Sequence, residues 1–153
     1  MERAKSNINQ SDLDTEIILT STPNLEEVGE KVVERWRALG LKAALRIESG
    51  IPHNFQALLI TQSIPEDPDQ YFLWHSTQEK TNLTNYDSKR IDKDLEDGRK
   101  VISEDERKTK YLDFQRVLME DAPAVFLYYP NYYITYLSKV EDKLEKILPL
   151  LIP

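Results

Sequence analysis

The sequence contains no cysteine, which excludes disulfide bonds and thiolate chemistry. Only four glycines are present, and none belongs to a glycine-rich phosphate-binding loop. The 20 Lys and Arg are outnumbered by 27 Asp and Glu, so the net charge is −7. This balance argues against a nucleic-acid surface, because phosphate contacts need clustered Lys and Arg. No window approaches the run of about 18 apolar residues that a membrane span requires. The first residues, Met1 to Asn7, also lack the apolar stretch of a signal peptide.

The remaining composition is that of an ordinary globular protein. Hydrophobic residues make up 40% of the chain and charged residues 31%. A length of 153 residues suits one domain with a substantial core. Residues 1–14 are polar and aperiodic, which predicts a flexible tail or a linker remnant.

The N-terminal half has the pattern of a β-α-β unit. A run from Thr15 to Thr22 predicts a strand, and its continuous apolar centre favours burial on both faces. Apolar residues then repeat at helical spacing over residues 24–39, and Asn24 with Glu27 has the spacing of a capping box. The short connections predict parallel strands joined by a right-handed crossover. The next predicted strands are Leu41–Ser49 and Phe55–Ile60.

The C-terminal half predicts two helices followed by strands. Asp87 or Ser88 can cap the first helix, and Ser103 starts a second capping-box pattern. Pro123 should end the second helix. The last predicted elements are strands over Ala124–Tyr129 and Tyr132–Leu137 and a weakly periodic helix over Val140–Leu148.

The run from Asp67 to Gln78 is the candidate ligand-binding segment. Large aromatics are followed there by small polar groups, a combination that suits a pocket for a polar organic ligand. In this interpretation Trp74 stacks on the ligand. The residues that would donate or accept hydrogen bonds are His75, Ser76 and Gln78. The alternative interpretation is a buried aromatic followed by a helix cap or a turn.

The aspartates on either side of Pro68 also have two interpretations. Asp67 and Asp69 could serve acid–base chemistry or bind a metal ion, but an Asx-turn held by the proline is favoured. His53 and His75 are the only histidines, and no pattern brings them together, so neither a metal nor a cofactor is predicted.

The same run resembles a segment of the bacterial extracellular solute-binding proteins of family 5, which serve peptide and nickel ABC transporters. The stretches Arg90–Lys93, Glu104–Arg107 and Asp121–Pro130 extend the resemblance. It covers roughly residues 15–140 and implies an α/β fold: the C-terminal lobe of a type II periplasmic-binding-protein fold, with a mixed sheet flanked by helices. Residues 141–153 would then form a terminal helix and tail.

The resemblance implies a binding module rather than an enzyme. Its ligand would be a solute, with an oligopeptide favoured, and the chain alone would be incomplete for binding. Its partners would be a missing N-terminal lobe and an ABC transporter permease, and the parent protein would be extracytoplasmic, either periplasmic or membrane-anchored. The implied ligand contacts add Gln62 and Ser63 to those of the aromatic run. Peptide-binding members often carry an acid that pairs with the peptide amine, where this chain has Ile64.

Two other functions compete with this interpretation. The first is a small hydrolase in which His75, paired with Asp67 or Asp69, acts on water. The second is a stand-alone protein-interaction domain.

Overall fold

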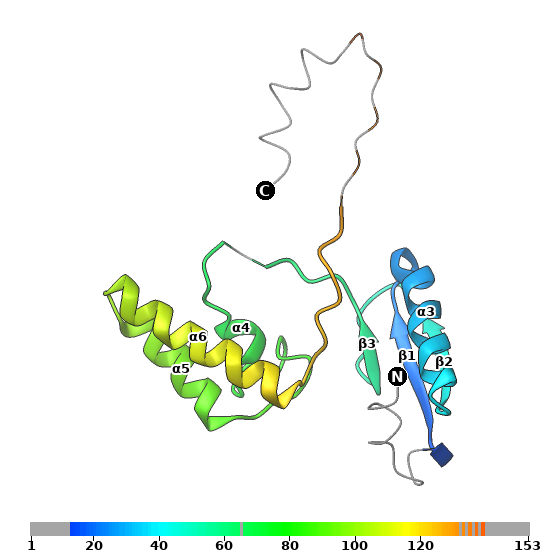
Figure 1. Cartoon of the computed structure of the whole chain (residues 1–153), viewed down its shortest axis with the longest axis horizontal. Helices are drawn as coiled ribbons and strands as arrows, with labels where there is room; N and C mark the ends of the chain where they lie inside the picture. The colour runs from blue at the N-terminus through cyan, green and yellow to red at the C-terminus, as the bar shows by residue number, and fades with distance from the viewer. Residues whose placement is uncertain are drawn as a thin grey trace. The chain divides into compact units, whose positions relative to one another are not determined.

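The computed structural model describes residues 13–64 and 66–131, together with 133, 135, 137 and 139. The chain divides into two compact units, Met1–Glu66 and Asp67–Pro153 (Figure 1). The predicted helix over Val140–Leu148 and most of the tail over 1–14 lie outside the described residues. Half of the predicted strand over Tyr132–Leu137, at residues 132, 134 and 136, lies outside them as well.

The first unit is a small parallel sheet with one helix packed on it. Strand β1 (Glu16–Ser21) leads through the short helix η1 (Pro23–Leu25) to α3 (Glu26–Ala38) and then to β2 (Lys42–Ile47). β2 pairs in parallel with β1, from Glu16 opposite Lys42 to Ser21 opposite Ile47. This arrangement confirms the predicted β-α-β unit and the α/β class.

The third strand, β3 (Ala57–Leu59), pairs with the other edge of β1 and is also parallel to it. The sheet order is β2-β1-β3, so the described sheet is parallel throughout, whereas a mixed sheet was predicted. Gln56 extends the β1–β3 pairing with its side chain. Its amide oxygen accepts from the Ile18 N–H at 2.7 Å, and its amide nitrogen donates to the Glu16 carbonyl at 3.3 Å.

Helix α3 packs on the sheet through a small apolar core. Leu19, Val33 and Ala43 are buried, and half-buried residues such as Trp36 and Leu45 surround them. The predicted cap at Asn24 is wrong. Pro23 begins the 3-10 turn, so Asn24 lies inside it, and Leu25 precedes the α-helix without a side-chain cap. Gly40 ends the helix with a φ of +100°, a conformation that glycine adopts without steric cost.

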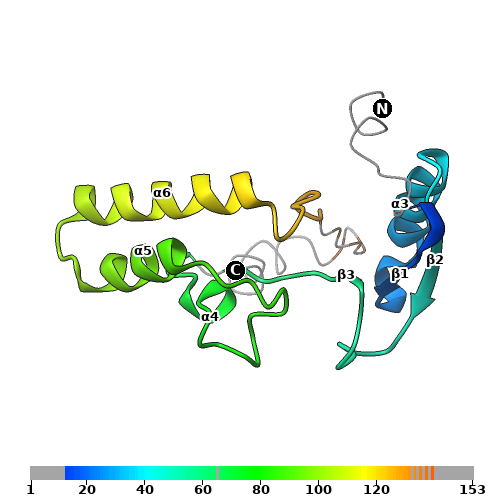
Figure 2. The same cartoon turned by 90° about the horizontal axis from the view of Figure 1, so that it is seen from below.

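The second unit is helical. It contains α4 (Tyr71–Trp74), α5 (Lys89–Lys100) and α6 (Glu104–Asp121). Helices α5 and α6 lie side by side and run antiparallel, joined by a short connection (Figures 1 and 2). Ser88 and Ser103 occupy the predicted N-cap positions, although neither side chain makes a capping hydrogen bond. The core between the two helices consists of Ile91, Leu95, Tyr111, Phe114, Val117 and Leu118.

The predicted strand over Ala124–Tyr129 is wrong. Helix α6 ends at Asp121, and Ala122 adopts a left-handed conformation with φ 48° and ψ 49°. The residues that follow have no regular secondary structure. A strand requires a neighbour that receives its backbone hydrogen bonds, and β-propensity alone does not supply one. Among the described residues, residues 124–129 form no such pairing.

A buried carboxyl group lies at the contact of α5 and α6. Asp94 is 7% exposed, and its Oδ2 has no partner among the described residues. Burial, followed by the neighbouring Asp113, raises the pKa of Asp94. Arg116 and Arg90 hold the pKa of Asp113 at about 2. The folded state therefore holds a proton on Asp94 more tightly than the unfolded chain does, so ionisation opposes folding, although the Lys110 ammonium, 3.8 Å from Oδ1, offsets part of this cost.

We expect Asp94→Asn to stabilise the second unit by about 1 kcal/mol at pH 7, because asparagine imitates the protonated acid and can donate to Asp113. Asp94 contributes fully to stability only below its unfolded-state pKa, and this contribution is lost as pH rises through the higher folded-state pKa. The gain should therefore disappear in acid. Denaturant unfolding of both proteins at pH 7 and at pH 3 is the measurement. An equal gain at both pH values would contradict the explanation.

Candidate functional site

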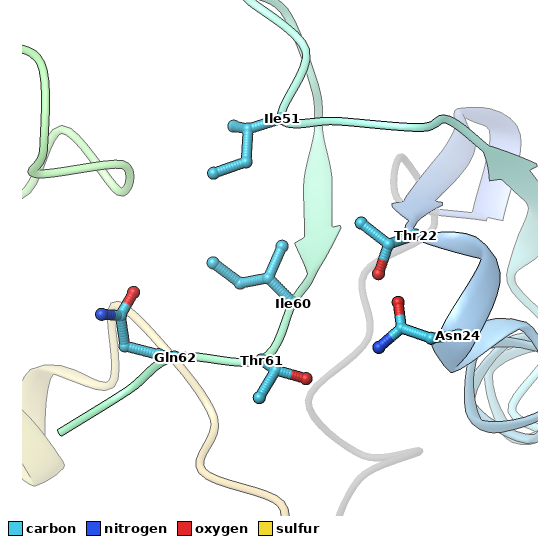
Figure 3. A pocket seen from close by; sticks show the side chains of 6 residues that line it. All are labelled: Thr22, Asn24, Ile51, Ile60, Thr61 and Gln62. Atoms are coloured by element: carbon cyan, nitrogen blue, oxygen red, sulfur yellow. The ribbon is translucent and has the colours of Figure 1, made fainter.

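A shallow pocket opens in the first unit where the parallel strands end. It has a volume of about 280 Å³. Thr22 directly follows β1, and Ile60 directly follows β3. Ligands of open parallel sheets commonly bind beyond the carboxyl ends of the strands, which is where this pocket lies. The lining residues are Thr22, Asn24, Ile51, Ile60, Thr61 and Gln62 (Figure 3).

The pocket combines neutral polar groups with aliphatic side chains. In Figure 3, Thr22 and Asn24 lie on one side of β3, and the side chains of Ile51 and Ile60 point to the other side. No charged residue is among the lining residues. Hydroxyl and amide groups can donate and accept hydrogen bonds, so they suit an uncharged polar ligand such as an amide.

Gln62 is the one residue of the predicted ligand set that lines this pocket. Its side-chain nitrogen donates to the Ser63 carbonyl at 3.0 Å, and both residues are exposed. Sequence reasoning missed the other lining residues. The signal that could have found Thr22, Thr61 and Asn24 is their place just after parallel strands, but no local motif marks them.

In the second unit, the Asp67-Pro68-Asp69 turn is tied to helices α5 and α6 by two arginines. Asp67 accepts from the Asp69 N–H at 2.8 Å and from Arg107 at 2.6 Å. Asp69 accepts from the Tyr71 N–H at 3.0 Å and from Arg99 at 2.6 Å. The hydrogen bond from Arg107 lowers the pKa of Asp67. These contacts confirm the favoured Asx-turn.

His75 is a buried link between α4 and α5. It is 4% exposed, and its ring stacks on Tyr71 with 4.1 Å between centroids. Nδ1 accepts from the Thr77 N–H at 3.2 Å, and Nε2 lies 3.4 Å from Glu96. Because Nδ1 accepts a hydrogen bond, the neutral tautomer with a proton on Nε2 fits this site. Both ring nitrogens of His75 therefore have partners within the protein.

The hydrolase pairing predicted from the sequence does not form. The carboxylates near the His75 ring are Glu96 at 3.4 Å and Asp92 at 3.8 Å. Within the described residues, neither Asp67 nor Asp69 forms an ion pair with His75, because both bind arginines. In a chain this acidic, the sequence could not indicate which carboxylate would face the ring.

The neighbours of His75 have different environments. Ser76 is bound to Asp92 twice, through its N–H at 2.9 Å and its hydroxyl at 2.5 Å. Trp74 is half-buried, packs against the core of the second unit, and meets the ring of Phe126 edge-on at 6.3 Å. Gln78 is half-buried, and its side chain donates to Thr77 at 3.3 Å.

Asn82 organises the loop that follows. It is 3% exposed, and its amide nitrogen donates to the carbonyl oxygens of His75 and Tyr86. Its amide oxygen accepts from the Thr84 hydroxyl and the Tyr86 N–H. The run from Asp67 to Tyr86 is therefore held by its own polar contacts and by the two long helices.

Neither a metal centre nor a membrane-spanning helix is found in the described part of the chain. No group of three or more His, Asp or Glu side chains there could hold a metal ion. Among the same residues, no helix is both long and apolar enough to cross a bilayer.

Comparison with known proteins shows which solute-binding proteins this chain resembles. No family model matches the chain. Over 109 residues the chain is 33% identical to the oligopeptide-binding protein AppA of Bacillus subtilis, a match that covers 69% of this chain and 19% of AppA. The chain thus spans about a fifth of the length of this relative.

Solved structures agree with the sequence match. The structure of AppA from Bacillus subtilis in complex with a nonapeptide superimposes with a TM-score of 0.69 at 26% identity, covering 75% of this chain and 26% of that one. NikZ from Campylobacter jejuni, in complex with Ni(L-His), shares the fold with a TM-score of 0.63 at 23% identity, over 71% of this chain and 25% of that one. The chain is therefore homologous to part of AppA, and its structure is part of the periplasmic-binding-protein fold that AppA and NikZ share. This confirms the resemblance predicted from the sequence.

Proposed function

We propose that this chain forms one lobe of the solute-binding component of an ABC transporter and that its solute is an oligopeptide. The observation that carries the proposal is the 33% identity to a protein named for oligopeptide binding. The chain is a binding module in this proposal, and its chemistry is recognition without bond cleavage. The parent protein would act outside the cytoplasm, where it would deliver the solute to a membrane permease.

The pocket beyond β1 and β3 supports a peptide ligand. Peptide backbones present neutral N–H and C=O groups, which the hydroxyls of Thr22 and Thr61 and the amides of Asn24 and Gln62 can bind. Ile51 and Ile60 add aliphatic surface for a small ligand side chain. We propose Gln62 as a ligand contact and Ser63 as its neighbour at the rim.

The residues of the run from Asp67 to Gln78 have two different roles in this proposal. Trp74, which retains exposed surface, and Gln78 are proposed as ligand contacts. His75 and Ser76 are bound within the protein, so we propose that they position Trp74. Ile64 is uncharged, which leaves the peptide amine without an acidic partner at that residue. Recognition of backbone groups would then matter more than recognition of the peptide amine.

A second lobe, supplied by the rest of the parent protein, is the proposed partner. A peptide gives up water on all sides when it binds, and its donors and acceptors must be replaced on all sides for this cost to be offset. We therefore expect calorimetric titration of a mixed peptide library into the isolated chain to give no heat beyond dilution at micromolar concentrations.

A chimera tests the proposal directly. The matching stretch of AppA is replaced by the corresponding residues of this chain, and peptide binding is measured by calorimetry. We expect the chimera to bind, and Gln62→Ala to weaken binding by about threefold to tenfold, the effect of losing one neutral hydrogen bond.

The matched control is Gln115→Ala on the exposed face of α6, which should leave affinity unchanged. A folded chimera that binds no peptide would contradict the proposed function. Equal losses in the two glutamine variants would remove Gln62 from the site.

A further inference from the structure

The loop between β2 and β3 is held at its two ends and is free in the middle. At one end the Glu48 N–H donates to the Ser21 carbonyl at 2.9 Å. At the other end the Asn54 carbonyl accepts from the Arg46 guanidinium at 3.1 Å. Between these anchors, residues 49–53 make no backbone–backbone hydrogen bond to any described residue. The middle of the loop can therefore adjust to a molecule that lies against it.

Ile51 lies in this free part of the loop and lines the pocket beyond β1 and β3. It is 54% exposed, so much of its apolar surface is open to a ligand. Its side chain and that of Ile60 point to the same side of β3 (Figure 3). Ile60 directly follows Leu59, which pairs with Ser21 in the sheet, so its position is fixed. Ile51 is therefore the residue that sets the width of the aliphatic part of the pocket.

The pocket offers no counter-ion to a charged ligand group. None of its lining residues is charged. Arg46 and Glu48, which flank the loop, bind each other at 3.0 Å. A charged group that enters such a pocket loses hydration without gaining an ionic partner. An aliphatic side chain, in contrast, gains free energy when it leaves water.

The size of the pocket also limits what enters it. Its volume of about 280 Å³ suits one residue of a peptide, because pockets for larger organic ligands measure roughly 300–1,000 Å³. We propose that this pocket selects peptides with an uncharged aliphatic side chain where they meet this lobe, and that Ile51 determines the selection. The inference rests on the proposed function and adds to it the class of peptide.

Peptides that differ at one residue test the selection in the AppA chimera. Leucine, lysine and glutamate are placed in turn at each position of a nonapeptide, and the affinities are measured by calorimetry. We expect one position at which the leucine peptide binds about tenfold or more tightly than either charged peptide. Ile51→Glu should make the lysine peptide the tightest binder at this position, because the new carboxylate supplies the missing opposite charge.

Ile102→Glu is the matched control. It introduces the same charge at a residue that is 100% exposed in the α5–α6 connection, so it should leave the order of affinities unchanged. Ile51→Lys is a second variant at the pocket, and it should favour the glutamate peptide.

The isolated chain gives a readout that needs no second lobe. N-acetylleucine amide at millimolar concentration should shift the amide resonances of Thr22 and Thr61 more than N-acetyllysine amide does, and Ile51→Glu should reverse this order. The same order in the wild type and in Ile51→Glu, in either experiment, would overturn the inference and leave the proposed function standing. A folded chimera that binds none of the peptides, with the reversal still seen in the isolated chain, would contradict the proposed function alone.

Discussion

Phe114→Ala is expected to lower the free energy of unfolding of the helical unit by about 3–5 kcal/mol, the usual cost of emptying a large aromatic site. Phe114 is 3% exposed and belongs to the buried core between α5 and α6, together with Leu95 and Leu118. Neighbouring side chains on two packed helices cannot collapse fully into the space that the ring leaves. Urea unfolding followed by far-UV circular dichroism is the measurement.

The control for Phe114 is on the same helix. Leu112 is 55% exposed, so Leu112→Ala should change stability by no more than about 0.5 kcal/mol. A comparable loss in both variants would mean that α6 does not pack through the face described here.

His75→Ala is expected to lower the free energy of unfolding by about 2–4 kcal/mol, because the change removes a buried ring and leaves the Thr77 N–H without its acceptor. His53→Ala is the matched control, since His53 is exposed. Thermal and denaturant unfolding of the two variants are the measurements. If His75→Ala were as stable as His53→Ala, His75 would not hold α4 against α5, and a direct role in ligand binding would be favoured.

The sequence predicted the elements whose periodicity agrees with their final packing. Apolar residues repeat at helical spacing in α3, α5 and α6, and short connections link the β-α-β unit. These local patterns predicted the elements that the structure shows. The Asp-Pro turn was also predictable, since aspartate beside proline favours an Asx-turn.

What the sequence could not predict depends on long-range contacts. The strand pattern of Ala124–Tyr129 is strong, but a strand also needs a pairing partner, which propensity does not reveal. The polar groups after Trp74 looked like ligand contacts, yet His75 and Ser76 bind Glu96 and Asp92 on α5, some twenty residues further along the chain. The pocket residues Thr22 and Thr61 come from two segments that meet only because β1 and β3 are neighbours in the sheet.

The most direct test of the proposed peptide site is nuclear magnetic resonance of the isotopically labelled chain titrated with peptide to millimolar concentration. One lobe alone should bind too weakly for micromolar calorimetry but should still respond in fast exchange. The account predicts that amide shifts concentrate at Thr22, Asn24, Thr61 and Gln62, around the pocket beyond β1 and β3. The absence of shifts at millimolar peptide, or shifts confined to the exposed face of α6, would contradict it.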